Sequence, residues 1–198
     1  AEPFKPPLVE VKSLAGNFTF NTDSVWWPAA QATLPGSRLA AGSGRYDINT
    51  NNLRLRLRAD PVASADLRWV SPRIPERGNG KLDFALDWVA DTSAYVAHNA
   101  DVQLADAHLS GDLGLTMTDT WFSLHKTNFQ LANRGTHRIQ QIVPLVKPPR
   151  QGILNGRLAV DGVQKALDVN ADVTFDERRS GRSRVLAVGK VGFDKGVT

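Results

Sequence analysis

The chain of 198 residues contains no cysteine, which excludes disulfide bridges, thiolate zinc sites and a cysteine nucleophile. The lack of thiols does not fix the compartment, because such a chain suits the periplasm and the cytosol equally. No apolar run approaches the roughly 20 residues that a membrane-spanning helix needs. The chain begins at Ala1 with neither an initiator methionine nor a signal peptide. We therefore expect a processed protein or a piece of a larger one.

The chain also has no large excess of positive or negative charge. There are 24 Lys and Arg residues against 20 Asp and Glu residues, which gives a formal net charge of +4. A nucleic-acid-binding surface needs a denser basic stripe than this, so no nucleic-acid partner is predicted. Hydrophobic residues make up 41% and charged residues 22% of the chain. Both fractions are close to globular averages, and the chain is therefore expected to fold.

Apolar residues instead recur at every second position. The run from Leu53 to Arg58 places leucines on one face and arginines on the other. The same alternation recurs at 82–88, 113–117, 158–160 and 167–173. A period of two is typical of half-buried strands, whereas a helix needs apolar residues three and four apart. The predicted fold class is mainly β, an extended antiparallel curved sheet forming a taco-shaped groove or an open sandwich, with one or two short helices.

Two regions break this alternation. Residues 24–36, with Trp-Trp-Pro and an alanine-rich stretch, are expected to hold a helical turn. Residues 136–147 have the spacing of a short helix until Pro144 interrupts it. The segment 147–152 indicates a stiff linker. These features predict a β-rich segment with short helical insertions over residues 1–147, and a C-terminal β module over 148–198 that continues the same sheet.

One short pattern, Gly-x-apolar-x-apolar, occurs six times. Its glycines are Gly16, Gly44, Gly80, Gly111, Gly156 and Gly189. Glycine at the entry of a strand with one apolar face favours a bend or bulge. The uneven gaps between copies exclude a strict solenoid but suit one strand pair with its connections per unit. The pattern predicts a sheet extended by repeated strand pairs.

No arrangement of residues supports catalysis. The four histidines, His98, His108, His125 and His137, lack metal-binding spacing. Alternation places most aspartates on the solvent side of strands or in turns. Neither a nucleophile elbow nor a phosphate-binding loop that opens a helix occurs. We predict no enzymatic activity, no catalytic residues, no metal and no cofactor.

Two other features allow alternative interpretations. The basic cluster from Arg178 to Arg184 could touch lipid phosphates or an acidic partner, although a solvated hairpin tip is the favoured interpretation. The aromatic residues on alternating segments fit the closed core of a sandwich. They fit equally a curved sheet whose apolar face stays partly open and holds an acyl chain. Periodicity does not separate these two, because both need one apolar face per strand.

The segments 108–115, 121–129 and 140–144, and then 152–162 and 167–175, resemble the strand-turn-strand units of the AsmA/TamB superfamily, which is also grouped with bridge-like lipid transfer proteins. The resemblance implies an elongated, taco-shaped sheet in the periplasm. It also implies that the parent protein is anchored in the inner membrane by an N-terminal helix that this chain lacks. The family's proposed role is to carry phospholipid toward the outer membrane or to assist outer-membrane protein assembly, and the family has no catalytic residues.

The leading hypothesis is a non-enzymatic periplasmic segment that binds or conducts phospholipid acyl chains along a hydrophobic groove for outer-membrane biogenesis, with outer-membrane assembly proteins as further expected partners. The residues expected to form the apolar, lipid-binding face are Leu53, Leu55, Leu57, Leu82, Phe84, Leu86, Trp88, Leu113 and Leu115. The alternative is a structural β-sandwich module of a secretion or outer-membrane assembly scaffold that recruits client polypeptides through its edge strands. A third hypothesis is carbohydrate recognition through exposed tryptophans.

Overall fold

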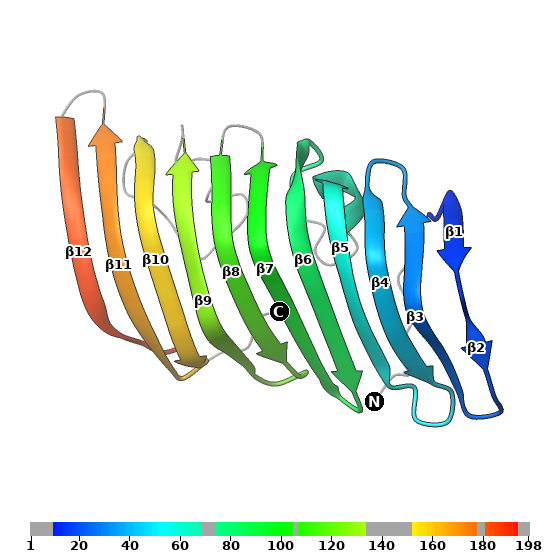
Figure 1. Cartoon of the computed structure of the whole chain (residues 1–198). Coiled ribbons are helices and arrows are strands. Elements are labelled where there is room, and N and C mark those ends of the chain that lie inside the picture. The colour runs from blue at the N-terminus through cyan, green and yellow to red at the C-terminus, as the bar shows by residue number, and fades with distance from the viewer. Residues whose placement is uncertain (1–9, 69–73, 105–106, 134–151, 178–180, 194–198) are drawn as a thin grey trace.

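The computed structural model describes residues 10–68, 74–104, 107–133, 152–177 and 181–193. These residues form one open, curved antiparallel sheet of twelve strands (Figure 1). The strands are β1 (Ser13–Gly16), β2 (Thr19–Phe20), β3 (Ser24–Thr33), β4 (Arg38–Asp47), β5 (Leu53–Ala63), β6 (Gly78–Val89), β7 (Thr92–Leu104), β8 (Ala107–Met117), β9 (Phe122–Asn133), β10 (Ile153–Val163), β11 (Ala166–Glu177) and β12 (Gly181–Val191). The predicted fold class is confirmed.

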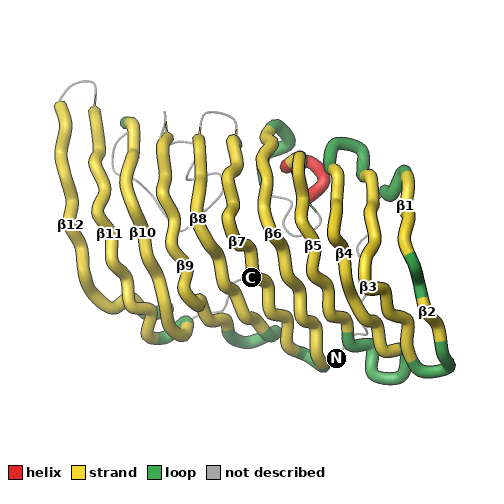
Figure 2. Tube along the Cα trace, viewed as in Figure 1, coloured by secondary structure: helices red, strands yellow, loops and turns green. Residues whose placement is uncertain are grey.

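The order of strands in the sheet follows their order in the chain. From β3 to β12 each strand pairs with the next one, while β1 and β2 both pair with β3 (Figure 2). All described strands belong to this one sheet, so the described residues do not form two facing sheets. Alternation along each strand then gives the sheet two faces of different chemistry.

The turn between β4 and β5 is the one expected from its asparagines. The Asp47 carboxylate accepts hydrogen bonds from the backbone N–H groups of Asn49 and Thr50, at 3.1 and 3.0 Å. Asn51 adopts a φ of 56°, a conformation that asparagine tolerates better than most residues. The polar run of residues 49–52 therefore closes a hairpin between β4 and β5.

The helical turn expected over residues 24–36 is wrong, because most of this segment is strand β3. Val25 and Trp27 lie opposite Tyr46 and Gly44 of β4, so the segment does alternate. The register shifts between Trp27 and Ala30, and this irregularity accommodates Pro28, which cannot donate to a regular ladder. The prediction of a helical turn failed because this irregularity interrupts the alternation of apolar residues along β3.

The second expected helix, at 136–147, lies outside the described residues, as does most of the expected linker. β9 and β10 on either side of it pair directly, with Leu158 opposite Phe129. The helix that the structure does describe is a short 3₁₀ turn, η1 (Ser64–Leu67), which the sequence analysis did not anticipate.

The glycine pattern corresponds to strand pairs. Its first glycine ends β1, and the other five lie in β4, β6, β8, β10 and β12, so each later unit is one strand pair. Gly111 and Gly156 have φ values of +137° and +151°, which side chains rarely adopt. A Cβ atom at either site would also collide with a carbonyl oxygen of the next strand, that of Asn128 or Asp172. These two glycines are therefore required by the backbone.

Candidate functional site

The predicted apolar residues fall into cross-strand rows. Residues directly opposite each other in neighbouring strands project from the same face of a sheet. In one row Leu57 lies opposite Phe84, Phe84 opposite Ala97, and Ala97 opposite Leu113. This row spans β5 to β8. We call the side of the sheet that carries these residues the apolar face.

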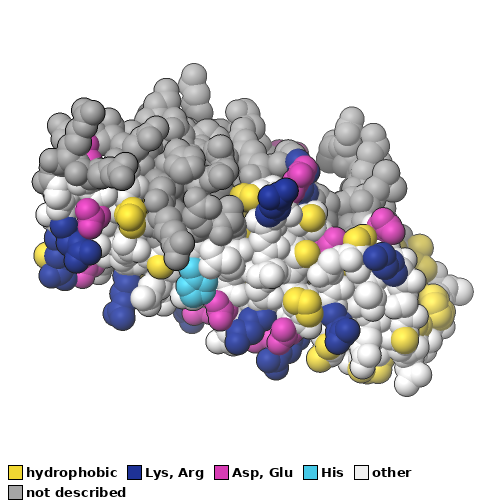
Figure 3. Space-filling view, turned by 90° about the horizontal axis from the view of Figure 1, so that it is seen from above, with side chains coloured by type: hydrophobic (Ala, Val, Ile, Leu, Met, Phe, Trp, Pro, Cys, Tyr) yellow, Lys and Arg dark blue, Asp and Glu magenta, His cyan; other side chains and the backbone are white. Residues whose placement is uncertain are grey.

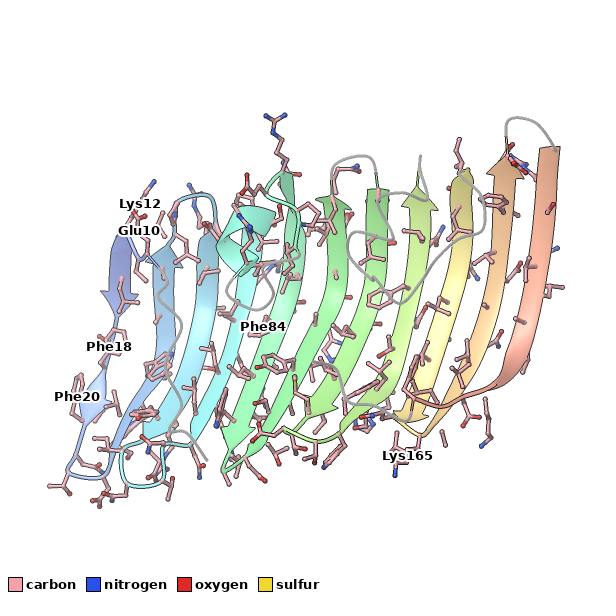
Figure 4. All side chains as sticks on the ribbon, turned by 180° about the vertical axis from the view of Figure 1, so that it is seen from behind. Glu10, Lys12, Phe18, Phe20, Phe84 and Lys165 are labelled. Atoms are coloured by element: carbon pink, nitrogen blue, oxygen red, sulfur yellow. The ribbon has the colours of Figure 1, made fainter. Side chains whose placement is uncertain are left out.

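Two further rows run beside the first. One contains Leu55, Leu86, Tyr95, Leu115 and Leu124, and the other Leu53, Trp88, Ser93, Met117 and Phe122. Leu82 lies opposite Ala59 on the same face. All nine residues predicted for the apolar face therefore lie on one side of the sheet. Figure 4 shows Phe84 near the middle of the sheet, far from Phe18 and Phe20 at the β1–β2 edge.

The apolar face extends beyond the predicted residues to the end of the sheet. In β9 to β12, Phe129, Leu158, Ala171 and Ala187 form a continuing row, and Val160, Val169 and Gly189 form another. Sequence reasoning had found the alternation in β10 and β11 but had not assigned these residues to the site. It had also missed Tyr95 and Ala97 of β7, although their spacing of two was a usable signal.

Most of the predicted side chains on this face are only partly shielded. Leu86 is buried, with 5% of its surface exposed. The other eight predicted residues are half-buried. A closed sandwich core would remove such side chains from water on all sides. These leucine and aromatic side chains can therefore bind a further apolar group. Each methylene buried against them contributes about 0.8 kcal/mol of binding free energy.

A small cavity opens at the β8–β9 hairpin end of the apolar face. It has a volume of about 210 Å³. Its apolar lining comprises Leu115, Met117, Trp121, Phe122 and Leu124. The indole of Trp121 is 43% exposed, so the cavity is reached from solvent at the hairpin. This size suits the end of a hydrocarbon chain rather than a whole lipid.

The opposite side, which we call the polar face, carries ion pairs between neighbouring strands. Arg56 of β5 donates two hydrogen bonds to the Asp87 carboxylate, at 3.0 and 2.7 Å. Arg184 of β12 binds Asp172 of β11 in the same two-pronged way, at 2.8 and 2.6 Å. Figure 3 shows cationic and acidic side chains next to each other in clusters along the molecule. The polar face is therefore a solvated surface of alternating charge.

The histidines do not assemble a metal centre among the described residues. His98 lies 3.2 Å from Asp112, and His108 lies 2.5 Å from Asp101, both across the β7–β8 pair. His125 contacts Ser123 of its own strand at 2.7 Å. His137 lies outside the described residues. The two histidine–aspartate contacts are exposed on the polar face, whereas Ser123 is buried.

Of the predicted basic cluster, residues 178–180 lie outside the described part of the chain. Arg182 and Arg184 belong to β12 itself and pair with Asp176 and Asp172 of β11. The cluster therefore reaches into the last strand, further than a hairpin tip extends.

Three half-buried aspartates are held in the charged form by their surroundings. Backbone and side-chain hydrogen bonds from Thr50 lower the pKa of Asp47. A hydrogen bond from His108 lowers the pKa of Asp101, and one from Arg184 lowers the pKa of Asp172. Each pKa lies below the ordinary value of 3.8.

These shifts predict a loss of stability in acid. A carboxylate whose pKa is lower in the folded than in the unfolded state stabilises the fold above its unfolded pKa, and this contribution disappears as the pH falls through the folded value. We expect the free energy of unfolding to fall below about pH 4, and Asp172→Asn to flatten that acid limb. Urea unfolding at a series of pH values measures this. The control is the same substitution at an exposed turn, Asp119→Asn. An Asp172→Asn profile that matches the unmodified protein would contradict the assignment.

Comparisons with known proteins identify no relative. No protein-family model matches the chain, and neither curated proteins nor solved structures gave a significant match. Within the described residues, no helix has the length and apolar character needed to cross a membrane. The described residues define a class of fold: one open β-sheet with one apolar and one charged face.

Proposed function

We propose that this chain binds phospholipid acyl chains on its apolar face and has no enzymatic role. The observation that carries the proposal is the continuous set of cross-strand apolar rows on one open sheet, with side chains that remain half-buried. An acyl chain needs no specific polar contact. Burying about ten methylenes gains roughly 8 kcal/mol before ordering costs, at about 0.8 kcal/mol each.

The resemblance to the AsmA/TamB superfamily extends this proposal. In that setting the chain is a periplasmic segment of an envelope protein anchored in the inner membrane, and it conducts phospholipid toward the outer membrane. The support is a matching architecture: an extended curved sheet built from repeated strand pairs, with an apolar face. Strands arranged side by side allow an acyl chain to move from row to row without crossing a charged residue.

The experiment is to purify the protein without detergent and identify extracted lipids by mass spectrometry. We expect phospholipid to copurify in a reproducible molar ratio. Brominated acyl chains quench tryptophan fluorescence on contact. They should quench the fluorescence of Trp88 on the apolar face more than that of Trp26, which lies opposite Arg45 on the polar face. Trp88→Phe should remove more of the quenching than Trp26→Phe. Absence of lipid together with equal quenching of both indoles would refute the proposal.

A second candidate function is a structural module that recruits client polypeptides. The specific observation in its favour is that β12 has a hydrogen-bonded neighbour on one side only among the described strands. Adding a strand to an open edge is an established way to bind an extended peptide. Recruitment at an edge is compatible with lipid binding on a face, because the two surfaces are distinct.

A further inference from the structure

The two edges of the described sheet differ in how well they are protected. At one edge β1 has 4 residues and β2 has 2, with a break between them. Short, interrupted edge strands are a common protection against unwanted pairing. At the other edge β12 runs for 11 residues and pairs with β11 without a register shift. All of its residues are exposed, so this edge offers a long, regular row of backbone hydrogen-bonding groups.

The centre of β12 is apolar on both sides of the sheet. Val185 and Ala187 belong to the apolar face, opposite Val173 and Ala171. Leu186 and Val188, however, lie on the polar face and are 68% and 85% exposed. Strands that are apolar on both sides normally have neighbours and cover on both sides. Exposed apolar groups on a long free edge indicate a surface that another chain covers.

The charged side chains of β12 indicate which kind of strand could pair with it. On the polar face, Arg182, Arg184 and Lys190 flank the apolar centre of β12. A second copy of β12, paired antiparallel with the longest overlap, would place Arg182 opposite Lys190 at both ends. Like charges directly opposite each other are destabilising. The strand that already pairs with β12 shows the complementary pattern, because β11 places aspartates 168, 172 and 176 against these three cations.

We propose that β12 is a docking edge for an acidic β-strand of another polypeptide chain, which adds antiparallel to the sheet. The incoming strand carries carboxylates within reach of the β12 cations, spaced as aspartates 168, 172 and 176 are in β11. The direction follows from the sheet, in which every described strand pair is antiparallel. The proposal rests on the second candidate function and is independent of lipid binding.

The test uses a synthetic peptide with the sequence of residues 166–177, which carries the required pattern of acids. Fluorescence anisotropy of the labelled peptide measures binding to the whole chain, and amide hydrogen exchange locates it. We expect saturable binding with protection of β12 amides. A peptide in which the three aspartates are replaced by lysine should bind at least tenfold more weakly, and one with three asparagines should lie between them. Added salt should reduce the difference in affinity between the aspartate and lysine peptides, because it screens the charges.

Protein variants give the matched control. Val188→Asp places a carboxylate on the docking edge at a side chain that is 85% exposed, so it should fold normally yet bind the acidic peptide at least tenfold more weakly. Ile48→Asp, at an exposed residue of the β4–β5 turn, should bind like the unmodified protein. Equal binding of the three peptides would overturn the proposal, because the edge would then not select acidic strands. Binding of none of the peptides would overturn the proposal and strand recruitment at this edge as well. Self-association of the free protein that Val188→Asp abolishes would assign the edge to a second copy.

Discussion

Leu115→Glu should reduce the phospholipid that copurifies with the protein by at least tenfold. Leu115 lies in a cross-strand row with Tyr95 and Leu124 and also lines the cavity at the β8–β9 hairpin. A carboxylate at this position either stays hydrated and displaces the hydrocarbon or loses its water, at a cost of several kcal/mol. A loss of about 1.4 kcal/mol is enough for a tenfold change in affinity. Quantitative lipid mass spectrometry per mole of protein measures the effect.

The matched control is the next residue in the same strand. Thr116 is half-buried on the polar face, opposite Ala94 and Ser123. Thr116→Glu introduces the same side chain 3–4 Å further along the backbone but on the other side of the sheet. Its lipid content should equal that of the unmodified protein. Circular dichroism and thermal unfolding of both variants separate lipid loss from misfolding. Equal loss from both variants, or from neither, would contradict binding on the apolar face.

Gly111→Ala should destabilise the sheet by about 2–4 kcal/mol, since it combines a disfavoured backbone conformation with a steric collision. The φ of Gly111 is +137°, and an added Cβ would collide with the carbonyl oxygen of Asn128 in β9. Relief requires β8 and β9 to separate, which weakens their hydrogen bonds. Urea denaturation gives the change in free energy of unfolding.

Gly189→Ala provides the comparison within the same sequence pattern. A Cβ at Gly189 meets no atom within 4 Å, so we expect a change within about 0.5 kcal/mol, as at other exposed sites. If both substitutions had the same effect, the glycine pattern would reflect composition and not backbone geometry. If Gly111→Ala alone destabilises, the repeated glycines divide into structurally required and tolerant positions.

The sequence predicted the sheet best where alternation was uninterrupted. The leucines and arginines of residues 53–58 lie on opposite faces of β5, because a strand permits no other arrangement of that pattern. Prediction failed in β3, where register shifts around Pro28 disturbed the period. In β7, Tyr95 and Ala97 were overlooked because the register shifts between Ala97 and Ala100 and the small residues there give a weak hydrophobic signal.

The residues predicted for the apolar face share one side of the sheet, but they did not show how far that face extends. Alternation shows which residues of one strand lie on the same face. The rows across strands depend on the pairing register, which is set by turns and bulges. The unusual character of β12 was not evident from alternation, because Leu186 and Val188 are ordinary strand residues by propensity. Their exposure becomes informative only when β12 is known to be the last described strand.

The meander order of the strands has a consequence for how the molecule folds and comes apart. From β4 to β11, each described strand pairs with the described strand just before it and the one just after it in the chain. We therefore expect folding to proceed by pairing of strands that are neighbours in the chain, whereas long-range pairings make many β proteins slow to fold. Stability becomes a sum over successive interfaces, as in repeat arrays. Under tension or in denaturant, such a sheet frays from its ends, and shortening it by a terminal hairpin removes two strand–strand interfaces while the remaining ladder persists.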